Sequence, residues 1–192
     1  YPLRRQRQMC IRDRYKRLIF VLSILILVGS TFAQSGYRDI AWGSTKLSAR
    51  KMAIGYFGDR YLETESKLIF NSPFQGNNGI YTFFFTDDSL HTVTIKSELP
   101  YVLSDEKKFS ENFEKSEKSI NDLIMRINGK YGRPLLNEQV GTDLFLRWED
   151  GDTEIELFVQ RSFKYNILMS YRWIPFFERR KEVKIQQYQN EL

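Results

Sequence analysis

The fold is decided by residues 143–160, which read DLFLRWEDGDTEIELFVQ. Apolar and polar side chains alternate on both sides of Asp150-Gly151, which is typical of two half-buried strands. An Asp-Gly pair between alternating runs is the strongest short signal of a two-residue hairpin turn. The sequence therefore predicts antiparallel strands at 143–149 and 152–160, and a third strand at 164–174.

A second set of three strands lies earlier in the chain. The runs KLIFN (67–71), GIYTFFFTDD (79–88) and SLHTVTIKSEL (89–99) are rich in β-branched and aromatic residues. The last two are joined through Asp87-Asp88-Ser89, which favours a tight turn. The segment between the first two, 71–79, is rich in Asn, Gly and Pro and is predicted to be a loop.

A helix pattern precedes each set of strands. Ser44 begins the first, STKLSARKMAIGY, and Ser104 can cap the second, which Gly132 and Pro134 end. The second helix carries an apolar stripe at helical spacing, formed by Phe109, Phe113, Ile120, Leu123, Ile124, Ile127 and Tyr131.

The order of one helix and three strands thus occurs twice, which predicts two units, 39–99 and 104–174, within a single domain, 34–175. Six antiparallel strands with both helices on one face form a two-layer α+β sandwich. The segment 176–192 is polar without a firm period, so we expect a frayed tail or a loose short helix.

Two segments precede the domain. Residues 1–14 resemble translated sequencing-adapter sequence and are interpreted as non-native; a genuine basic leader is the alternative. Residues 15–33 combine a basic start, the apolar run LIFVLSILILVGSTFA and a terminal Ala33, the order of a secretory signal peptide. The run of about 16 residues is shorter than the roughly 20 that a membrane span needs. An uncleaved N-terminal membrane anchor is the alternative.

The basic balance of the chain belongs to this leader. The chain has 29 Lys and Arg against 24 Asp and Glu. Residues 1–33 hold seven of those bases and one of those acids, so residues 34–192 carry 22 bases and 23 acids, a net charge of −1. We expect no nucleic-acid partner, since binding needs a basic surface. The only cysteine is Cys10, so the domain has no disulfide and no thiol ligand for a metal.

Three short segments carry a resemblance to known proteins: Ile40-Ala41-Trp42-Gly43-Ser44, Lys130-Tyr131-Gly132-Arg133-Pro134 and Trp148. With the repeated layout, they resemble the tandem repeat of the β-lactamase inhibitor protein and the SmpA/OmlA type of outer-membrane assembly lipoprotein. Other secreted bacterial α+β proteins are similar too. Neither type implies catalytic residues. No cysteine follows the apolar run, so the lipid anchor of the second type is not expected.

No pattern points to catalysis or to a cofactor. His91 is the only histidine and alternates in phase with Val93 and Ile95, which favours a packed position. Asp87-Asp88 and Asp150-Gly151-Asp152 gather carboxylates, but both coincide with predicted turns. We predict no catalytic residue, no metal ligand and no cofactor; a hydrolase-like enzyme with a carboxylate site is the alternative.

Strand alternation also predicts a binding surface. The sheet face away from the helices is mostly polar, yet it carries one apolar residue on each of five strands: Phe84, Leu90, Phe145, Phe158 and Leu168. A contiguous apolar patch with a polar rim marks an interaction site. The hypothesis is that this face docks a protein partner or a second copy; the alternative is that the tail from Phe176 onward covers it.

The sequence therefore predicts an exported non-enzymatic domain, periplasmic or secreted, that binds a protein or envelope partner. A purely structural protein of the bacterial envelope is a further alternative. Contact with the membrane is expected only through residues 15–33, if they remain uncleaved.

Export yields the first testable prediction. Because Thr31 and Ala33 occupy the positions that a signal peptidase recognises, we expect a mature N-terminus at or near Gln34. Intact-mass measurement of protein expressed in a bacterium checks this. Retention of the apolar run in the mature chain would show an anchor instead.

Overall fold

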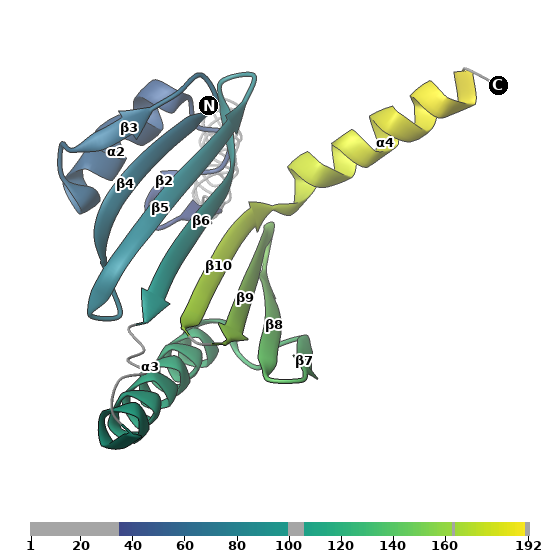
Figure 1. The fold of residues 1–192 in the computed structure, drawn as a ribbon. Coiled ribbons are helices and arrows are strands. Elements are labelled where there is room, and N and C mark those ends of the chain that lie inside the picture. The colour runs from purple at the N-terminus through teal and green to yellow at the C-terminus, as the bar shows by residue number, and fades with distance from the viewer. Residues whose placement is uncertain (1–34, 100–105, 163, 191–192) are drawn as a thin grey trace, which may run out of the picture. The chain divides into compact units, whose positions relative to one another are not determined.

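The computed structural model describes residues 35–99, 106–162 and 164–190. In this part of the chain, eight strands form one antiparallel sheet in the order β3-β4-β5-β6-β10-β9-β8-β7, and β1 and β2 form a separate hairpin (Figure 1). The strands are β1 Gly36–Tyr37, β2 Ile40–Ala41, β3 Tyr61–Glu63, β4 Lys67–Phe74, β5 Asn77–Thr86, β6 Ser89–Leu99, β7 Leu136–Val140, β8 Asp143–Asp150, β9 Thr153–Arg161 and β10 Tyr165–Trp173. The helices are α2 Lys46–Phe57, α3 Glu106–Tyr131 and α4 Ile174–Asn190.

Three of the predicted segments lie outside the described residues: the block 1–14, the signal segment 15–33 and the capping residue Ser104. The first helix is capped by Thr45 rather than Ser44, since the Thr45 hydroxyl accepts a hydrogen bond from the Ser48 amide at 3.3 Å.

The sheet consists of two four-stranded meanders, each preceded by a helix. Strands β3 to β6 follow α2, and β7 to β10 follow α3. The last strands of the two meanders, β6 and β10, pair antiparallel at the centre of the sheet.

The predicted six-stranded sheet from two helix-then-three-strand units was therefore wrong, because each unit has a fourth strand. The missed strands lie at the two edges of the sheet. β3 has three residues, and β7 reads LNEQV with four of its five side chains exposed. Polar or very short edge strands protect a sheet against unwanted pairing, and they leave no apolar alternation for a sequence pattern to detect.

The predicted loop at 71–79 was also wrong, because β4 and β5 continue through it and turn at Gln75-Gly76. Both turn residues have positive φ, 53° and 76°, as a type I′ hairpin turn requires. Pro73 is tolerated near the end of β4 because β3 pairs only with Leu68–Phe70, which leaves the outer edge of β4 free at this point.

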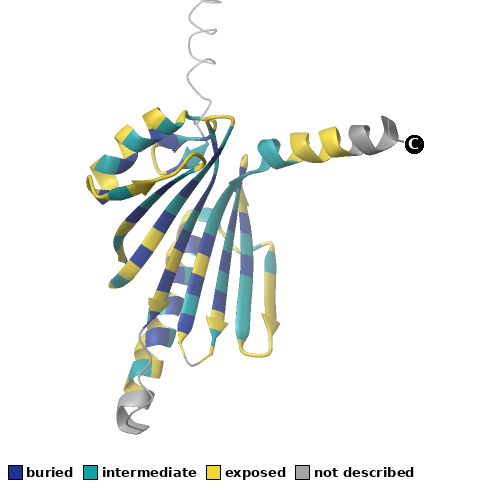
Figure 2. Cartoon of the chain, turned by 45° about the horizontal axis from the view of Figure 1, so that its top comes forward, coloured by how far each residue is buried: buried dark blue, intermediate teal, exposed yellow. Residues whose placement is uncertain are grey.

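One apolar core lies between the sheet and the two helices α2 and α3. Burial alternates along β5, β6 and β9, which gives the bands visible in Figure 2. The helices contribute Ala49, Ala53 and Phe57 from α2, and Ile120, Leu123 and Ile127 from α3. All of these side chains belong to one core cluster with the strands, so both helices cover the same face of the sheet.

The core predicts the effect of truncating α3. Ile120 is fully buried, so Ile120→Ala should lower the free energy of unfolding by about 2–5 kcal/mol. Met125 on the same helix is 62% exposed, and Met125→Ala should change it by less than about 0.5 kcal/mol. Denaturant melts of the two variants check this; equal losses would mean that the face of α3 is assigned wrongly.

Candidate functional site: the open face of the sheet

The face of the sheet opposite the helices carries a row of side chains that are in register on seven strands. We call it the central row, and from β4 to β7 it reads Asn71, Ile80, Lys96, Leu168, Phe158, Phe145 and Glu138. Ile80 and Leu168 are 44% and 42% exposed, and the two phenylalanines are half-buried. The row therefore presents an apolar strip that Lys96 interrupts and that ends in polar residues.

Three of the five predicted surface residues, Phe145, Phe158 and Leu168, are neighbours in the central row. Phe84 lies outside the row and packs under the Lys67 ammonium, which is 5.2 Å from its ring centroid. Ile80 lies within the predicted strand 79–88 but was not among the predicted surface residues. The available signal was its spacing from Phe84, because residues 80 and 84 are an even number apart on one strand and therefore lie on the same face of the sheet.

Leu90, the fifth predicted surface residue, was assigned to the wrong face and is fully buried in the core. The cause is a β-bulge in the pairing of β5 with β6. Phe84 lies opposite Thr92 and Phe85 opposite Leu90, so His91 has no partner and the alternation of faces shifts by one residue. A bulge is a local irregularity of pairing that strict alternation does not predict.

A second row lies beside the central row. From β4 to β7 it reads Ile69, Thr82, Thr94, Ser170, Glu156, Arg147 and Leu136. This second row is also in register on the same seven strands, so the two rows together cover the middle of the open face.

Two arginines and two glutamates form a charged cluster on β8, β9 and β10. Arg172 pairs with both Glu154, at 3.0 Å, and Glu156, and Arg147 pairs with Glu154 at 3.6 Å. The Nε groups of both arginines are buried, and neither has a hydrogen-bond partner among the described residues. A buried donor without an acceptor is costly, and the ion pairs with Glu154 and Glu156 offset part of that cost.

The bulge directs His91 to the first turn of α4. Its ring stacks on Phe176 with centroids 4.4 Å apart, and its nitrogens lie 3.1 Å and 2.9 Å from the hydroxyls of Thr86 and Thr92. Burial, and secondarily the positive charge of Arg180, lower the pKa of His91 below its usual value. These contacts hold only the start of α4.

Up to residue 184, the described tail does not cover the central row. Residues 178–184 of α4 are all exposed, and so are Leu168 and Ile80 of the central row. These residues do not support the alternative that the segment from Phe176 onward folds back over the apolar patch, and the side chains of residues 185–192 lie outside the described part of the chain.

The predicted carboxylate groupings have turn roles. Asp87 and Asp88 form the β5–β6 turn with φ of 50° and 57°, and the Asp88 carboxylate accepts a hydrogen bond from the Lys46 amide at the start of α2, at 2.9 Å. Asp150 and Asp152 flank Gly151, which has a φ of 56° in the β8–β9 turn. Among the described residues, no three His, Cys, Asp or Glu side chains gather as a metal site would require.

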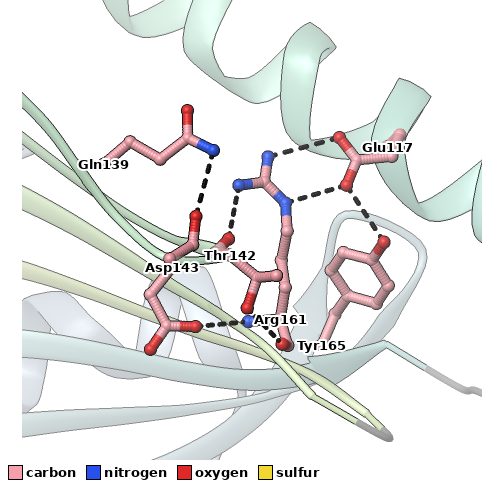
Figure 3. A network of polar contacts seen from close by, with 7 residues as sticks. Glu117, Gln139, Thr142, Asp143, Arg161 and Tyr165 are labelled. Atoms are coloured by element: carbon pink, nitrogen blue, oxygen red, sulfur yellow. Dashed lines mark hydrogen bonds and ion pairs between the residues drawn. The ribbon is translucent and has the colours of Figure 1, made fainter.

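A polar network on the helix-covered face ties α3 to the sheet (Figure 3). Glu117 of α3 accepts hydrogen bonds from Arg161 Nε at 2.8 Å and from the Tyr165 hydroxyl at 3.0 Å. Arg161 also donates to the Thr142 carbonyl at 2.9 Å, and its amide donates to Asp143. Glu117, Thr142, Arg161 and Tyr165 line a groove of about 730 Å³, but the charges of Glu117 and Arg161 satisfy each other. We interpret the network as structural.

No protein-family model, curated protein or solved structure matches the chain. The resemblance to the β-lactamase inhibitor protein and to the SmpA/OmlA type therefore stays a prediction, as does the periplasmic or secreted location. Among the helices that the structure describes, none is both long and apolar enough to span a membrane.

The environment of His91 predicts a pH dependence of stability. A pKa that is lower in the folded state means that folding favours the neutral ring, so this contribution is present above the unfolded pKa of about 6.5 and is lost as the pH falls. Between pH 7 and pH 5, the wild-type chain should lose more stability than His91→Gln in denaturant melts. Parallel losses in the two proteins would exclude His91 as the cause.

Proposed function

We propose that the protein is an exported non-enzymatic binding domain whose open sheet face docks a second copy of the same chain. The observation that carries this proposal is that the central row is complementary to itself. The proposed export rests on the signal-like pattern of residues 15–33.

The self-complementarity is seen when two sheets face each other and a twofold axis is placed between them. The axis runs parallel to β10 and passes over Leu168. Such an axis reverses the order of strands, so Leu168 meets Leu168 and Lys96 meets Phe158 of the other copy. Ile80 meets Phe145, and Asn71 meets Glu138. Each meeting is favourable: two apolar contacts, one cation over an aromatic ring, and one amide donor against a carboxylate.

The same twofold rotation also places the residues of the second row opposite favourable partners. Ser170 lies on the axis, Thr94 meets Glu156, Thr82 meets Arg147, and Ile69 meets Leu136. The Thr82 hydroxyl would supply an acceptor to the exposed part of the Arg147 guanidinium, whose side chain is 38% exposed. An interface between identical subunits needs this kind of match about one axis.

The size of the face suits a stable dimer. Seven strands at about 4.8 Å spacing span roughly 29 Å, and all of them except the five-residue β7 have eight to eleven residues and extend for roughly 26 Å or more. This area is of the order of the ~800 Å² per partner that specific interfaces bury. Two sheets stacked in this way form an ordinary face-to-face sandwich.

The proposal predicts that the purified chain is a dimer and that a charge at the axis separates it. In sedimentation equilibrium, Leu168→Arg should weaken self-association by at least about tenfold, since two arginines would then face each other in an apolar strip; tenfold is about 1.4 kcal/mol.

The matched control is Leu47→Arg, which adds the same charge at a leucine of α2 that is 52% exposed. This variant should remain dimeric. A monomeric wild-type chain at concentrations on the order of 100 μM would contradict the proposal, because dimers of this interface size are stable well below that range. Equal weakening by both variants would also contradict it.

A further inference from the structure

The helix-covered face of the sheet contains a hollow of about 270 Å³ between the β1–β2 hairpin, α3 and the central strands. The helices α2 and α3 pack on the β4 and β8 sides of the sheet, and the hollow lies over β5, β6 and β10. Its floor is apolar and includes Ile95, Met169, Leu123 and Ile127.

Four tyrosines from four elements line the hollow: Tyr37, Tyr81, Tyr131 and Tyr171. The rings of Tyr37 and Tyr171 contact each other with centroids 4.8 Å apart, and the Tyr81 hydroxyl donates a hydrogen bond to the Pro73 carbonyl at 3.2 Å. Burial raises the pKa of Tyr37 to about 12 and also raises the pKa of Tyr171. Both phenols are therefore neutral near pH 7, so the walls add no negative charge.

Three cations, Arg38, Arg126 and Lys130, also line the hollow, and none of them pairs with a carboxylate among the described residues. Among the described residues, the Arg126 guanidinium donates to oxygens of two uncharged groups, the Gln75 side chain and the Asp122 carbonyl. Lys130 lies over the Tyr131 ring at 4.8 Å. None of the described residues that line the hollow is acidic, so the charged side chains of its lining are all cationic.

The position of Arg38 is also set by its backbone. Arg38 has a φ of 55°, which a non-glycine residue adopts only at a cost, and its guanidinium lies 5.0 Å from the Phe57 ring centroid and 5.7 Å from that of Tyr37. Elsewhere in the described domain, Arg147, Arg161 and Arg172 pair with glutamates.

We propose that this hollow binds a small organic anion with a flat apolar body and one carboxylate. The body would lie on Ile95, Met169 and the tyrosine rings, and the carboxylate would face Arg126 and Lys130. The volume is just below the range of sites for drug-sized ligands, which points to a ligand of about two fused rings. A bare inorganic anion would make no use of the apolar lining, and a neutral ligand would gain nothing from the cations.

The proposed anion site and the proposed dimer face can be tested independently of each other. Met169 and Tyr171 point to the hollow, whereas their neighbours on β10, Leu168 and Ser170, belong to the two rows of the open face. A variant on one side of β10 therefore leaves the other side intact.

The experiment titrates the purified full chain with 2-naphthoate and follows the heat of binding. We expect saturable binding with one ligand per chain, a dissociation constant below about 1 mM, and weakening by added salt. The neutral isostere 2-naphthylmethanol should bind at least about tenfold more weakly, and inorganic phosphate should not displace the naphthoate.

Variants assign the binding to the hollow. Arg126 and Lys130 are exposed at its mouth, so Arg126→Gln and Lys130→Gln should keep the fold and weaken naphthoate binding about fivefold or more each. Lys118→Gln is the matched control, because Lys118 is an exposed cation of α3 outside the hollow, and it should bind as the wild-type chain does. The proposal is overturned if naphthoate does not saturate, if phosphate displaces it, or if Lys118→Gln weakens binding as much as Lys130→Gln.

Discussion

The structure depends on the antiparallel pairing of β6 with β10. Eight residue pairs, from Thr92 opposite Arg172 to Leu99 opposite Tyr165, join two meanders that are otherwise built from local hairpins. Because successive side chains point to opposite faces, this one ladder places Ile95 beside Met169 in the core and Lys96 beside Leu168 on the open face. Both proposed binding surfaces are therefore consequences of a single long-range register.

The two faces of the central strands differ in whether their charged side chains are balanced by opposite charges. On the open face, the arginines of β8 and β10 are neutralised by glutamates of β9, so the surface is polar but nearly balanced. On the helix-covered face, the hollow that contains Arg38, Arg126 and Lys130 has no acidic residue among its described lining. The balanced charges of the open face suit an equally balanced partner such as another copy of the chain. The cations of the hollow suit an anion.

The sequence predicted the elements that carry a strong period and missed those that do not. The Asp150-Gly151 hairpin, the helix that ends at Tyr131 and the alternation of β8 to β10 follow from local patterns. β7 is a polar edge strand, and the bulge at His91 shifts the faces of β6, so Leu90 was placed on the surface although it is buried. The hollow could not be predicted, because its lining comes from six separate segments that only the tertiary fold brings together.

Cross-linking between copies tests the proposed pairing of the central row most directly. In chains in which Cys10 is replaced by serine, Ile80→Cys and Phe145→Cys are each treated with a bismaleimide of short span. In the proposed dimer these positions face each other, whereas two copies of residue 80 are roughly 19 Å apart across four strand spacings. The account predicts covalent dimers when the two variants are mixed and few when either is treated alone. Equal cross-linking in all three samples, or none in the mixture, would contradict it.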